Sequence, residues 1–130
     1  MESEIPVCSD GRATYPIRVL IVDRHYAVRQ ALCTFLTAFD DLCLVGEASC
    51  GEEMVRLCTV AHPDVVLLDV TLPDMTGAAA VGAVRGSWPR STVIAMGTFQ
   101  EESLAGDLLR AGAERYLLKN VSAGQLADAI

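Results

Sequence analysis

The stretch Val65-Val-Leu-Leu68, followed at once by Asp69, indicates the fold class of this chain. Every residue of the run is apolar, as expected for a strand that is covered on both faces. Similar short runs alternate along the chain with segments of helical period, of which the first places these apolar residues on one stripe: Ala27, Val28, Ala31, Leu32, Phe35, Leu36 and Phe39. The alternation predicts repeated units of a strand followed by a helix.

Five such units follow one another. The expected strands span residues 18–22, 42–48, 65–68, 91–96 and 116–118. Pro63 ends the second helix, Gly112 follows the fourth, and Ser122 with Gln125 forms a capping box for the last. Five units with short connections predict an α/β fold with a parallel sheet and helices on both faces.

The two ends of the chain differ in character from this pattern. Residues 1–16 carry no apolar period, so we expect a flexible leader before a single domain at 17–130. The last helix stops at Ile130 after barely two turns, which predicts that this helix is truncated and that the native protein continues.

The composition narrows the class of protein. The chain has 130 residues, of which 52% are hydrophobic, and a net charge of -7 that disfavours direct binding to nucleic acid. The cysteines show no CxxC spacing, and four of them (Cys33, Cys43, Cys50 and Cys58) lie in apolar segments, which favours a role as small packing residues. No apolar run is long enough to span a membrane, so we expect a cytoplasmic protein without membrane contact.

Three polar residues follow the expected strands directly: Asp23, Asp69 and Lys119. Each alone would be typical of a turn, a helix cap or a solvated surface. The carboxyl ends of parallel strands meet at one edge of the sheet, where such folds bind ligands. Together the three residues predict a functional site at this edge.

The same positions lie in motifs that resemble the response-regulator receiver family. Over residues 17–130 the resemblance rests on Val22-Asp23, Leu67-Leu-Asp69-Val-Thr-Leu-Pro73-Asp-Met-Thr-Gly77 and Gly112-Ala-Glu-Arg-Tyr-Leu-Leu-Lys119. The NarL/LuxR branch is indicated by Val45-Gly-Glu-Ala48, Gly51-Glu-Glu53 and Thr98-Phe99. The resemblance implies a doubly wound, flavodoxin/CheY-like sheet with strand order 2-1-3-4-5. It also implies a regulatory protein rather than an enzyme, with a histidine kinase and a second copy of the chain as partners. DNA would be bound only through a further, C-terminal domain.

Family resemblance also assigns roles to site residues. Asp69 is the implied phosphoacceptor, and Lys119 the cation that contacts the phosphoryl group. Mg²⁺ would be held by Asp23, Asp69 and the backbone carbonyl of Thr71. The implied conformational switch involves Gly97, Thr98 and Tyr116.

Two departures from the family pattern predict impaired chemistry. Arg24 stands where the family has a second acid, so the charges of Asp23 and Asp69 are cancelled by Arg24 and Lys119, and Mg²⁺ binding is expected to be weak or absent. Arg24 either points to solvent or pairs with Asp69. Gly97 has no hydroxyl for the phosphoryl group, and period-two alternation turns the adjacent Thr98 to the other face.

Three functions remain open from the sequence. A receiver whose state is set without phosphate is favoured over a conventional, phosphorylation-competent receiver. A flavodoxin-like small-ligand binder is disfavoured because Asp23-Arg-His-Tyr26, and not a glycine-rich loop, follows the first strand. His25 receives no catalytic role because a lone His at a helix start is typically a cap-region residue, and His62, beside Pro63, gives no metal-ligand spacing with it.

Overall fold

A computed structural model describes residues 16–98 and 102–130 and confirms the expected sheet. The strands are β1 (Ile17–Val22), β2 (Leu42–Ala48), β3 (Val65–Asp69), β4 (Thr92–Gly97) and β5 (Arg115–Leu118). All neighbouring strands are parallel, in the order β2-β1-β3-β4-β5. Every residue of β3 is buried, as its apolar run predicted.

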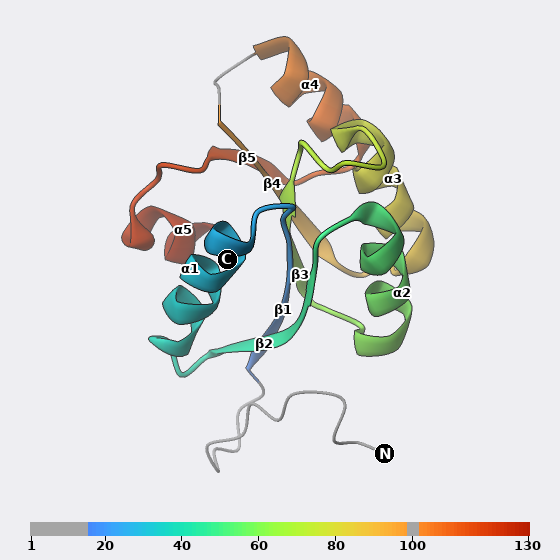
Figure 1. The fold of residues 1–130 in the computed structure, drawn as a ribbon. Coiled ribbons are helices and arrows are strands. Elements are labelled where there is room, and N and C mark those ends of the chain that lie inside the picture. Colours follow the sequence, from blue (N-terminus) through green and yellow to red (C-terminus); the bar gives the residue numbers. More distant parts are fainter. Residues whose placement is uncertain (1–15, 99–101) are drawn as a thin grey trace.

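Five helices connect and cover the strands, as Figure 1 shows. They are α1 (Tyr26–Thr37), α2 (Gly51–Ala61), α3 (Gly77–Ser87), α4 (Glu102–Ala111) and α5 (Ala123–Ala129). Helices α1 and α5 cover one face of the sheet, and α2, α3 and α4 cover the other. The core is accordingly divided into two main clusters, one on each face.

Local sequence signals explain where several helices begin and end. The Ser122 hydroxyl accepts a hydrogen bond from the Gln125 amide (3.1 Å), and the Gln125 side chain accepts one from the Ser122 amide (3.0 Å). This is the expected capping box, and it fixes the start of α5. Gly112 has a φ of 121° after α4, a conformation that favours glycine.

The apolar stripe of helix α1 is covered only in part. Leu36 is buried, and Leu32 and Phe35 pack against the same core cluster. Val28 and Leu32 are half-buried, and Ala27 and Ala31 are exposed. The period of the stripe marks which side of the helix is apolar, but burial also requires a neighbour that covers it.

The cysteine interpretation holds only in part. Cys58 is a buried free thiol, and burial raises its pKa to about 11, as expected for a packing residue. Cys33 and Cys50 are free and half-buried. Cys43 is buried in a small core cluster, as expected for a packing residue, but it is also disulfide-bonded, which its apolar segment did not indicate. The leader (1–16) apart from Pro16, and the motif residue Phe99, lie outside the described residues.

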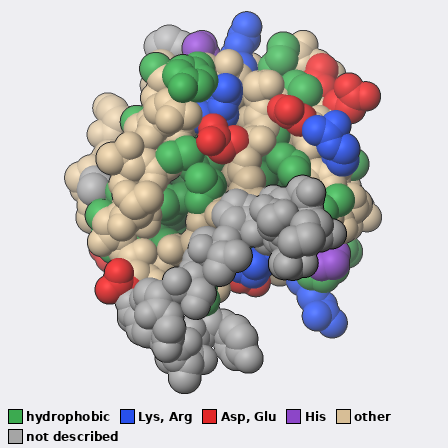
Figure 2. Space-filling view, turned by 60° about the horizontal axis from the view of Figure 1, so that its bottom comes forward, with side chains coloured by type: hydrophobic (Ala, Val, Ile, Leu, Met, Phe, Trp, Pro, Cys, Tyr) green, Lys and Arg blue, Asp and Glu red, His purple; other side chains and the backbone are tan. Residues whose placement is uncertain are grey.

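Figure 2 shows one face of the molecule, on which neither positive nor negative side chains form one large patch among the described residues. Lys and Arg side chains there are separated from one another and interspersed with Asp and Glu, around a hollow lined by hydrophobic side chains. Within the described residues, no helix is both long and apolar enough to cross a membrane.

Candidate functional site

The ends of β1, β3 and β5 bring the three expected polar residues together. The Lys119 ammonium lies 2.9 Å from Oδ2 of Asp23 and 3.1 Å from Oδ1 of Asp69. The two aspartates are only 3% and 1% exposed. A buried carboxylate requires a counter-ion or hydrogen-bond donors, and Lys119 serves both carboxylates at once.

Asp69 is held in its ionised form by its neighbours. Burial alone would raise the pKa of Asp69, but the amide (3.0 Å) and hydroxyl (2.8 Å) of Thr71 donate to Oδ1 and, with Lys119, hold that pKa below its ordinary value. Burial would also lower the pKa of Lys119, yet the hydrogen bonds and charges of Asp23 and Asp69 raise it. The site is therefore a charged, hydrogen-bonded cluster at neutral pH.

Arg24 takes part in this cluster in a way that the sequence did not resolve. Its backbone amide lies 3.4 Å from Oδ2 of Asp69, and its guanidinium donates a hydrogen bond of 3.3 Å to the backbone carbonyl of Thr71. Within the described part of the chain, the guanidinium forms no ion pair with Asp69. Of the two expected alternatives, the Arg24–Asp69 ion pair is not formed, and the Arg24 side chain is exposed to solvent while its guanidinium also contacts the Thr71 carbonyl.

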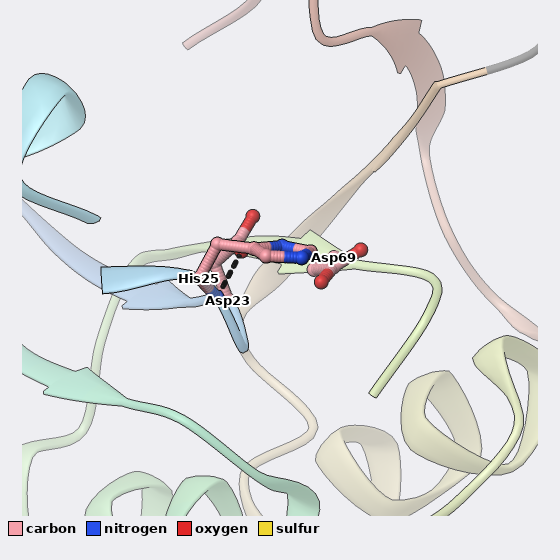
Figure 3. Close-up of side chains that lie close together, drawn as sticks. All are labelled: Asp23, His25 and Asp69. Carbon is pink, nitrogen blue, oxygen red and sulfur yellow. Dashed lines mark hydrogen bonds and ion pairs between the residues drawn. The ribbon is translucent and has the colours of Figure 1, made fainter. Parts of the chain in front are cut away.

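His25 lies closer to the site than expected for a residue without a role there. Its amide donates to Oδ1 of Asp23 (2.8 Å), and its Nδ1 is 3.3 Å from the same oxygen. Figure 3 shows the His25 ring beside Asp23 and directed toward Asp69, and one ligand atom from each residue lies within 4.8 Å of the others. Its side chain is 60% exposed, so His25 lies between the buried carboxylates and solvent.

Gly97 and Tyr116 are coupled by packing. A Cβ atom placed on Gly97 would lie 2.2 Å from the Tyr116 hydroxyl oxygen and 2.9 Å from Cζ. The Tyr116 ring thus occupies the space that a serine or threonine side chain would need. Thr98, the residue that follows β4, is exposed.

Comparison with known proteins establishes the family. The model of the response regulator receiver domain matches residues 19–130. The chain belongs to the response-regulator receiver family. This receiver is 39% identical over 114 residues to the transcriptional regulatory protein LiaR of Bacillus subtilis (strain 168), covering 88% of the chain and 54% of LiaR. It is 33% identical to the response regulator protein VraR of Staphylococcus aureus (strain NCTC 8325 / PS 47), with the same coverages. The chain spans about half the length of these curated relatives.

Solved structures agree with this assignment. The signal receiver domain of NarL from Mycobacterium tuberculosis has a TM-score of 0.84 and 29% identity, covering 89% of this chain and 94% of that one. A LuxR-family two-component response regulator from Aurantimonas sp. SI85-9A1 has a TM-score of 0.82 and 27% identity, covering 88% and 81%. Receiver domains are signalling modules that bind Mg²⁺ through acidic residues, and the Asp23, His25 and Asp69 cluster lies at the corresponding edge of this sheet.

Two features of the site escaped the sequence analysis. The Arg24 contact depends on a side-chain rotamer and on the path of the loop after β3. The packing of Tyr116 over Gly97 could have been predicted from the register of β4 and β5. Tyr116 pairs with Ala95, and Gly97 lies two residues further along the same face. Such diagonal neighbours are within reach of an aromatic ring.

Proposed function

We propose that this receiver belongs to a transcription regulator and that its conformational state is set without efficient phosphorylation of Asp69. The observation that carries the proposal is the hydrogen bond from the Arg24 guanidinium to the Thr71 carbonyl. That carbonyl is one of the three groups expected to hold Mg²⁺. A cation fixed to the protein is already in contact with it.

The residues present fit Mg²⁺ poorly. The position of the second acid carries Arg24, whose guanidinium contacts the Thr71 carbonyl, and the two carboxylates, Asp23 and Asp69, already share Lys119 as their ion-pair partner. Mg²⁺ prefers an octahedral shell of oxygen ligands and gives up its water reluctantly. A metal would have to displace the guanidinium and overcome its repulsion, so we expect weak or absent Mg²⁺ binding.

The Gly97–Tyr116 contact supports the same proposal. Gly97 provides no hydroxyl to a phosphoryl group on Asp69, and losing one such donor typically costs roughly 2.7–4 kcal/mol of transition-state stabilisation. Tyr116 packs into the vacated space and is half-buried there. A switch that moves this ring in response to phosphate has no side chain at residue 97 to act through.

The proposal also includes a further domain and partners of the whole protein, which the relatives support. LiaR is named a transcriptional regulatory protein, and this chain matches about half of it. We therefore place a DNA-binding domain elsewhere in the whole protein, consistent with the net charge of -7 here. The protein acts in the cytoplasm through contacts with other proteins and not as an enzyme. A histidine kinase and a second copy of the chain are its candidate partners.

Acetyl phosphate labelling tests the proposal. The wild type, Arg24→Asp, and Arg24→Asp combined with Gly97→Thr are incubated with Mg²⁺ and acetyl phosphate and followed by intact mass. We expect labelling in the double variant, abolished by adding Asp69→Asn, and at most trace labelling of the wild type. Arg90→Asp is the matched control because it makes the same charge change at an exposed residue away from the site. Stoichiometric, Mg²⁺-dependent labelling of wild-type Asp69 would establish the conventional receiver instead.

A further inference from the structure

An apolar cavity beside the phosphorylation site is not explained by receiver chemistry. It has a volume of about 280 Å³. Four residues on one side of α1 and one residue of β4 form its wall: Ala27, Val28, Ala31, Leu32 and Met96. Asp23 and Lys119 form its polar end.

The cavity accounts for the uncovered apolar stripe of α1. Toward the C-terminal end of the helix, Leu36 is buried in the cluster that also contains Leu126 of α5. Toward the N-terminal end, the stripe turns to the cavity, and Ala27 and Ala31 remain exposed. Apolar side chains beside a concave space of this size favour occupation by a small apolar molecule.

The polar end limits the chemistry of such a molecule. An ammonium has three hydrogens to donate, and within the described residues the Lys119 ammonium has two acceptors, Asp23 and Asp69. One hydrogen is therefore available to an acceptor in the cavity. Because two carboxylates outnumber the one ammonium here, an anionic ligand would be repelled. A neutral hydroxyl or amide can accept from Lys119 and donate to a carboxylate oxygen of Asp23.

We propose that this cavity binds a small neutral molecule with an apolar body and one hydroxyl or amide group. An apolar cavity of about 150 Å³ holds benzene, so about 280 Å³ suits a body of two fused rings. The ligand would lie between α1 and Lys119, and it would bind whether or not Asp69 accepts phosphate. The inference therefore goes beyond the proposed function and does not depend on it.

Binding of three matched probes tests the proposal by methyl and amide NMR on the 130-residue chain. The probes are 2-naphthylmethanol, 2-methylnaphthalene and 2-naphthoate, which differ only at the polar end. We expect saturable shifts at the methyl groups of Val28, Leu32 and Met96 with 2-naphthylmethanol, and weaker binding of the other two. Lys119→Met should remove the preference for the alcohol over the methyl compound.

Variants of α1 distinguish binding in the cavity from non-specific binding to the exposed apolar surface of the helix. Ala31→Phe fills the cavity and should weaken 2-naphthylmethanol binding by about tenfold or more. Gln30→Phe adds the same ring at the neighbouring exposed residue and should leave affinity within about twofold. Ala27→Phe is the second filling variant, and circular dichroism checks that each variant is folded.

Several outcomes would overturn the proposal. They are no saturable shift with any probe, equal affinity for the alcohol and the methyl compound, tightest binding of 2-naphthoate, or unchanged affinity in folded Ala31→Phe. Sedimentation equilibrium adds one more. If the chain is a dimer that Ala31→Phe dissociates, then the stripe is a self-association surface and not a ligand site.

Discussion

Replacing Gly97 by alanine should force the Tyr116 ring out of its place. The added Cβ would lie 2.2 Å from the Tyr116 hydroxyl oxygen, 2.9 Å from Cζ and 3.1 Å from Cε1. Side-chain rotation can relieve these contacts because they involve the far end of the ring and not the backbone. The cost is then the packing of the half-buried ring against the core, for which we expect about 1–3 kcal/mol.

A double-mutant cycle with Tyr116→Ala isolates this contact. In the Tyr116→Ala background the steric conflict is absent, and alanine is favoured over glycine in a strand by about 0.5–1 kcal/mol. Gly97→Ala should therefore destabilise the wild type and slightly stabilise the Tyr116→Ala variant. The interaction free energy should be about 2 kcal/mol, measured by urea unfolding with far-UV circular dichroism.

Gly82→Ala provides the matched control. A Cβ at Gly82 meets nothing within 4 Å, and the residue lies inside α3, so this change should stabilise both backgrounds by about 1 kcal/mol. Equal effects of Gly97→Ala in the two backgrounds would refute the claim that Tyr116 occupies the space above Gly97. That result would also remove one of the two supports for phosphate-independent regulation.

Three further substitutions test how the site and its scaffold are held. Lys119→Met leaves two buried carboxylates without their counter-ion and should cost about 3–5 kcal/mol near neutral pH, measured by urea unfolding. The pKa of Asp69 is depressed in the wild type, so its stabilising contribution is lost as pH falls through that pKa. Without Lys119, a buried carboxyl is favoured in its protonated form, so the Lys119→Met variant should instead become more stable as pH falls from neutral. Arg85→Lys should cost about 2 kcal/mol because Arg85 donates to Gly112 O (2.8 Å) and Glu114 Oε1 (2.7 Å) through a fork that lysine lacks; a loss below that of Arg90→Lys would contradict this. Ser122→Ala should cost about 1 kcal/mol by thermal unfolding, with an unchanged midpoint arguing against the capping box.

The sheet and the location of the site were accessible from sequence because they follow from general rules. Apolar runs alternating with helical stripes lead to parallel strands, and the carboxyl ends of parallel strands share an edge. Asp23, Asp69 and Lys119 were therefore expected together before any distance was known. The Ser122–Gln125 capping box also depends only on local spacing, and it forms as expected.

Other features of the site and the core depend on side-chain rotamers, loop paths and helix positions, which the spacing of residues in the sequence does not determine. Arg24 is long enough to reach either the Asp69 carboxylate or the Thr71 carbonyl, and the path of the loop after β3 decides between them. The α1 stripe indicates an apolar side, but whether α5 or a cavity lies against it depends on where α5 begins. The disulfide at Cys43 likewise cannot be read from an apolar segment alone.

A Mg²⁺ titration of the wild type beside Arg24→Asp tests the central claim most directly. The amide signals of Asp69 and Thr71 report on the two groups that a bound metal would contact. We predict saturable shifts in Arg24→Asp, whose added carboxylate restores an oxygen ligand and frees the Thr71 carbonyl. The wild-type signals should not move at Mg²⁺ concentrations that saturate the variant. Saturable wild-type shifts at the same or lower concentrations would contradict the view that Arg24 has taken the place of the metal.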